Sequence, residues 1–117
     1  MFNVLYLGKE ATYVGSVVKG AAWARAGVKV YIHDSIADAQ ESITAADRNK
    51  FKLVMISYAL LSAEEGVPID AAVALQSCFG NVPVIALVSD PRFSEELQVA
   101  ASERSKSISA VLLSHSS

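Results

Sequence analysis

The sequence predicts a single α/β domain built on an open, doubly wound sheet of five parallel strands. Five short runs rich in Val, Ile and Leu recur without clean polar alternation, which is typical of strands buried on both faces of a parallel sheet. Segments of helical length separate these runs, so the order βαβαβαβαβ fits within 117 residues. The expected strands are Asn3–Leu7, Val28–His33, Leu53–Ser57, Val82–Ser89 and Ile108–Leu113.

The amino-acid composition argues against several classes of protein. Hydrophobic residues make up 52% of the chain against 19% charged, and the net charge is −2, so neither disorder nor direct binding of nucleic acid is expected. The single cysteine, Cys78, excludes an intramolecular disulfide, is expected to pack and not react, and suits a reducing cytoplasm. Apolar stretches such as Val82–Val88 fall far short of the roughly 20 residues that a membrane helix needs. We therefore expect a cytoplasmic domain with no membrane span.

The first two helices are predicted from their apolar spacing and end signals. The first covers about Thr12–Ala26, with Trp23 near the edge of its apolar side and Gly27 as its stop. The second follows Ser35 as N-cap, with Asp38 three residues on. Its apolar positions are Ile36, Ala39, Ile43 and Ala46.

Two further helices follow the third and fourth strands. One begins at Pro68, whose fixed φ suits the first turn, and ends before Gly80. Its expected buried residues are Ile69, Ala72, Leu75 and Phe79. The other begins near Phe93 or Ser94 and fades into a polar loop, Ser102–Ser107. Its expected inward residues are Phe93, Leu97, Ala100 and Ala101.

Function in such sheets is expected beyond the carboxyl ends of the strands, at the switch in strand order. The residues that the prediction brings to this edge are Gly8, Lys9, Glu10, Asp34, Ser57, Tyr58, Ser89, Asp90, Ser114 and His115.

Three segments, Val4–Glu10, Phe51–Ser57 and Val82–Ser89, resemble the first, third and fourth strands of response-regulator receiver domains (CheY-like). The resemblance covers nearly the whole chain and implies a flavodoxin-like fold with strand order 2-1-3-4-5. Because the sequence stops soon after the fifth strand, the family's fifth helix is expected to be short or absent. The single domain, residues 1–117, is expected to be part of a longer signalling protein.

Receivers accept a phosphoryl group on an aspartate at the end of strand three, and Mg²⁺ is held there by that aspartate and an acidic pair after strand one. Magnesium requires carboxylate oxygens and water as ligands. Here the acceptor position falls on Ser57, and the acidic pair falls on Gly8 and Lys9, which leaves only Glu10. No acidic residue occurs between Lys52 and Ala63, so a shifted alignment supplies none.

The remaining receiver positions are also altered. The strand-four hydroxyl falls on Val88, with Ser89 one place later, and the strand-five lysine falls near His115. A lone histidine without a carboxylate or cysteine partner makes neither a proton relay nor a metal site, so His115 is expected to be exposed and inert. The resemblance thus implies a degenerate pocket formed by Gly8, Lys9, Glu10, Ser57, Val88, Ser89 and His115, with no metal, no cofactor and no catalytic residue.

Several single residues have two interpretations. Lys9 either replaces the metal charge or is a solvated lysine. Asp34 and Asp90 either bind a metal or ribose or cap the helices that follow them. Tyr58 suits a partner interface or packing over the third strand, and His33 is a pH-sensitive group or a partly buried structural one.

Two hypotheses for function remain. The first is a non-phosphorylatable pseudo-receiver: a regulatory domain, not an enzyme, that binds a protein partner, a flanking domain or a second copy in two-component-type signal transduction. The alternative is a small-ligand or nucleotide-binding domain that uses the loop 8–12, Asp34, Ser57 and Ser89.

Overall fold

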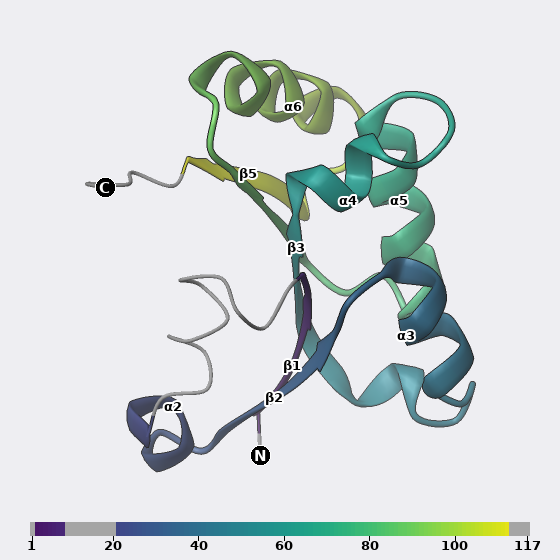
Figure 1. The fold of residues 1–117 in the computed structure, drawn as a ribbon, viewed down its shortest axis with the longest axis vertical. Helices are drawn as coiled ribbons and strands as arrows, with labels where there is room; N and C mark the ends of the chain where they lie inside the picture. Colours follow the sequence, from purple (N-terminus) through teal and green to yellow (C-terminus); the bar gives the residue numbers. More distant parts are fainter. Residues whose placement is uncertain (1, 9–20, 113–117) are drawn as a thin grey trace.

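The computed structural model describes residues 2–8 and 21–112, with the side chains of 21 and 22 left out. It contains a five-stranded, all-parallel sheet in the order β2-β1-β3-β4-β5, so the chain has a flavodoxin-like α/β fold (Figure 1). This confirms the predicted strand order. The strands are β1 (Phe2–Leu7), β2 (Val28–His33), β3 (Phe51–Ser57), β4 (Val84–Val88) and β5 (Ile108–Leu112).

Five helices and one 3₁₀ turn are described. They are α2 (Ala21–Arg25), α3 (Ile36–Ser42), η1 (Arg48–Lys50), α4 (Tyr58–Ser62), α5 (Pro68–Cys78) and α6 (Pro91–Arg104). None of these helices is long and apolar enough to cross a membrane. Of the first predicted helix, residues 12–20 lie outside the described residues, as does any helix after β5.

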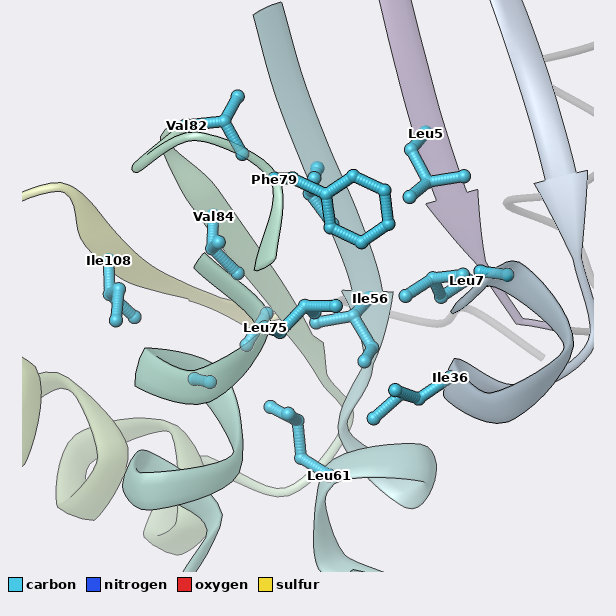
Figure 2. Close-up of a cluster of buried hydrophobic side chains, with 14 of the residues drawn as sticks. Leu5, Leu7, Ile36, Ile56, Leu61, Leu75, Phe79, Val82, Val84 and Ile108 are labelled. Atoms are coloured by element: carbon cyan, nitrogen blue, oxygen red, sulfur yellow. The ribbon is translucent and has the colours of Figure 1, made fainter. Parts of the chain in front are cut away.

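The main core lies on the face of the sheet that α3, α4, α5 and α6 cover. Figure 2 shows Leu75 and Phe79, from α5 and its C-terminal end, lying over strand residues Leu5, Ile56 and Val84. The expected buried side of α5 is therefore confirmed, because Ile69, Ala72, Leu75 and Phe79 are all buried. Cys78 packs against this core, as predicted.

A smaller cluster lies on the opposite face, where Figure 1 places α2. Its buried members are Tyr6 and Leu87, and Trp23 of α2 packs against them. Strand residues alternate between the two faces, so Tyr6 belongs to this cluster while its neighbours Leu5 and Leu7 belong to the main core.

The helices of the structure differ from the predicted ones at four points. Helix α3 ends at Ser42, so Ala46 lies outside it and is exposed, although Ile43 remains buried as the C-cap. Helix α4 was missed. Helix α6 begins at Pro91, two residues before the predicted start at Phe93, because Asp90 caps it and Pro91 fits its first turn. At its other end, residues 102–104 are helical although they were predicted as loop.

Phe93 was predicted to face inward, but its side chain is 41% exposed. The early start of α6 does not change the helical spacing. Phe93 instead lies against the ring of Tyr58, a contact with another element that spacing does not reveal.

Candidate functional site

The carboxyl edge of the three central strands brings Gly8, Ser57 and Val88 close together. In the register of the sheet Leu7 pairs with Ile56, so the next residues, Gly8 and Ser57, follow at the same level. Ser57 in turn pairs with Leu87, one residue before Val88. The register therefore brings together the ends of three of the predicted edge segments. Lys9, Glu10 and His115 lie outside the described residues, as does most of the loop 8–12.

Ser57 ends β3 and leads directly into α4. Its backbone is extended (φ −66°, ψ 134°), it occupies the N-cap position, and its hydroxyl does not cap the helix. The side chain is partly buried. The side chain at the carboxyl end of β3 is thus a neutral hydroxyl group, and the ten residues 53–62 carry no carboxylate.

Gly8 is confined by Tyr6. A Cβ atom at position 8 would lie 2.7 Å from Tyr6 Oη and 2.9 Å from Tyr6 Cζ. The Tyr6 side chain is 2% exposed and belongs to the smaller core cluster, so its ring has little room to move away. A side chain at position 8 would therefore collide with the Tyr6 phenol unless that ring shifted, whereas glycine fits without strain.

The residues after β4 have separate roles. Val88 is buried in the main core, whereas Ser89 is exposed. Asp90 Oδ1 accepts a hydrogen bond from the Arg92 backbone N–H (2.8 Å), and its Oδ2 lies 3.0 Å from Arg92 Nη2. The Arg92 side chain, followed by its backbone N–H, lowers the pKa of Asp90. Asp90 is thus a helix cap, the second of its two interpretations.

The end of β2 is likewise structural. Ser35 Oγ accepts from the Asp38 backbone N–H (3.0 Å) and caps α3, as predicted, while Asp34 is exposed. His33 Nδ1 lies 2.8 Å from Asp38 Oδ2, and the His33 side chain is 18% exposed. This contact joins β2 to α3 and agrees with the partly buried structural interpretation of His33.

Tyr58 packs beside the edge instead of extending into solvent. Its ring stacks on Phe93 with centroids 5.2 Å apart and an interplanar angle of 12°. Burial raises the pKa of the Tyr58 hydroxyl, and the charges of Glu96 and Asp90 add to that shift. Tyr58 thereby links the start of α4 to the start of α6.

A pocket of about 200 Å³ opens next to this stack, at a place that no sequence motif indicated. It is lined by Tyr58, Val67, Pro68, Ile69, Leu97 and Ala100, with Glu96 as its charged member. Three helices contribute these residues, so only their packing reveals the pocket. The apolar sequence that directly follows β3, with Tyr58 and Leu61 three residues apart, was the one available signal for α4.

Among residues 2–8 and 21–112, no group of three or more His, Cys, Asp or Glu side chains is placed to hold a metal ion. Comparisons with protein-family models, with curated proteins and with solved structures find no match for the chain.

Proposed function

We propose that the chain is a regulatory, protein-binding domain of the pseudo-receiver type, acting in signal transduction in the cytoplasm without accepting phosphoryl groups and without catalysing a reaction. The observation that carries this proposal is Ser57 at the carboxyl end of β3. Receiver domains, which share this strand order, have the acceptor aspartate at the end of the third strand, and a serine hydroxyl cannot form an acyl phosphate.

The neighbouring position supports the same conclusion. A receiver needs a carboxylate after β1 to hold Mg²⁺, and Gly8 supplies none. Tyr6 Oη also lies 2.7 Å from the point that a Cβ atom at position 8 would occupy. Without phosphate and metal to bias the edge, the conformational equilibrium must be set by the sequence or by a protein partner. The partner is another protein or a flanking domain of a longer chain.

Incubation with a small-molecule phosphodonor and Mg²⁺, followed by intact-mass analysis, tests the proposal. The expected result is an unmodified mass after an incubation that fully phosphorylates a competent receiver run in parallel. A stoichiometric adduct of one phosphate, labile to base, would overturn the proposal. A phosphate ester at a surface hydroxyl is distinguished by its resistance to neutral hydroxylamine, which cleaves an acyl phosphate.

A further inference from the structure

The groove between the start of α5 and α6 has the size of a side-chain anchor site. We call it the α5–α6 groove, defined by the residues that line its pocket of about 200 Å³. Small-molecule sites usually have volumes of about 300–1,000 Å³. A pocket of this size instead suits one large apolar side chain, and such anchors dominate the energy of protein interfaces.

The rim of the groove exposes further apolar surface. Val67 is 53% exposed and Phe93 is 41% exposed, although Phe93 stacks on Tyr58. An aromatic surface held in one place by stacking loses little entropy when a partner covers it. The groove therefore combines a pocket with a preformed apolar border.

The segment that forms the groove is predominantly acidic, although the Arg92 guanidinium lies over the Phe93 ring at the rim, 5.8 Å from the ring centroid. Residues 57–105 contain seven acidic and two basic side chains, a net charge of −5, whereas the rest of the chain has five acidic and eight basic ones, a net charge of +3. Both bases of this segment are already paired within it: Arg92 with Asp90 at 3.0 Å and Arg104 with Asp70 at 2.6 Å.

Five glutamates of this segment form no ion pair with another residue in the described part of the chain: Glu64, Glu65, Glu95, Glu96 and Glu103. Glu96 lines the pocket, and Glu103 lies seven residues later on the same side of α6. Glu64 and Glu65 instead line a separate pocket beside α3, together with Ile36 and Ala37. Charge complementarity therefore selects a cationic occupant.

We propose that the α5–α6 groove docks a cationic amphipathic segment of a partner protein. One large apolar side chain of that segment enters the pocket, and Lys or Arg residues on either side of it lie against Glu96 and Glu103. This inference rests on the proposed regulatory function and names the surface and the chemistry of the partner. A second copy of the chain would have to present its own basic region to the groove, and the sedimentation experiment below distinguishes that occupant.

A pair of synthetic peptides tests the docking. The first is a fluorescein-labelled amphipathic peptide of about four helical turns, with Leu on one face and Lys on the other. The second is identical except that Glu replaces every Lys. Fluorescence anisotropy with the full chain is expected to show saturable binding of the Lys peptide and at least tenfold weaker binding of the Glu peptide. Equal binding of the two peptides would overturn the proposal.

Two variants with matched controls locate the contact. Glu96→Lys is expected to weaken binding of the Lys peptide by about fivefold, the scale of an exposed ion pair lost and reversed. Glu41→Lys, the same charge change on the exposed part of α3, is expected to leave the affinity within twofold. Ala100→Leu fills the pocket from α6 and is expected to weaken binding at least tenfold, whereas Ala37→Leu on α3 is not. Circular dichroism confirms that all four variants fold.

Two outcomes would contradict the groove proposal. If Glu96→Lys and Glu41→Lys weaken binding equally, the interaction reflects net charge and the groove proposal is wrong. If sedimentation shows that the protein alone forms dimers that Glu96→Lys dissociates, a second copy is the occupant and the proposal also fails. A phosphate adduct at the carboxyl edge of the sheet would overturn the proposed function, whereas the groove proposal is judged by the peptide affinities and the sedimentation result.

Discussion

Tyr6 and Gly8 show how the packing of one side chain constrains the residue two positions along the chain. Strand alternation directs Tyr6 to the smaller core, and its hydroxyl ends 2.7 Å from where a Cβ at position 8 would lie. The glycine is thus the residue that the tyrosine allows. An acidic side chain at this position requires a different residue at position 6, so the two positions are expected to change together.

Gly8→Ala tests this coupling. We expect a loss of about 1–3 kcal/mol in the free energy of unfolding, because the added methyl overpacks a site next to a buried ring. Urea denaturation followed by circular dichroism measures the loss. In a Tyr6→Leu background the same substitution is expected to cost much less, since the phenol is gone. Equal costs in the two backgrounds would show that Tyr6 does not determine the residue at position 8.

At the scale of the element, α4 and α6 show what the spacing of apolar residues in the sequence can and cannot detect. The five strands were predictable because buried parallel strands are continuous apolar runs, and α5 because Pro68 and Gly80 mark its ends. Helix α4 has only five residues and follows β3 without a Gly or Pro boundary, so the sequence contains no stop signal between them. Phe93 was predicted wrongly because its partner, Tyr58, belongs to another element.

Leu61 tests whether α4 is an integral part of the fold. Its side chain is fully buried in the main core. We expect Leu61→Ala to lower the free energy of unfolding by about 2–5 kcal/mol, the usual range for a leucine removed from a packed core. Leu112→Ala is the control, because Leu112 is 45% exposed. Similar small losses for both variants, measured by urea denaturation, would mean that α4 contributes little to the core.

The cap of α6 predicts a pH dependence. Hydrogen bonds from Arg92 lower the pKa of Asp90, so the stabilisation is complete above the ordinary carboxyl pKa, near 4, and is lost as the pH falls through the lower folded-state value. Asp90→Ala is therefore expected to lower Tm at pH 7 and to have a smaller effect at about pH 2. Thermal unfolding at the two pH values measures this difference.

Asp34→Ala provides the matched control for the cap. Asp34 follows β2 as Asp90 follows β4, but Ser35 caps α3 in its place. We expect Asp34→Ala to change Tm little at either pH. An effect of Asp90→Ala that is equally large at low pH would show that the carboxylate charge is not what stabilises α6.

At the scale of the whole molecule, the strand order could be predicted from the sequence, whereas the groove and the acidic segment around it could not. The strand order followed from the receiver resemblance and is confirmed, and the absence of a carboxylate in residues 53–62 is read directly from the sequence. Two features could not be predicted: the contact with Tyr6 that favours glycine at position 8, and the α5–α6 groove. Each depends on how side chains of different residues pack in three dimensions. The net charge of −2 likewise conceals a −5 segment.

The central claim is that the carboxyl edge of this sheet binds neither a phosphoryl group nor its metal. Two-dimensional amide NMR of the full chain with Mg²⁺ and beryllofluoride tests it most directly, because a complex of this phosphoryl analogue is observed in place and does not depend on a labile covalent adduct. We predict no saturable shifts at Gly8, Ser57 or Ser89 beyond those caused by ionic strength. Saturable, Mg²⁺-dependent shifts confined to these residues would contradict the claim.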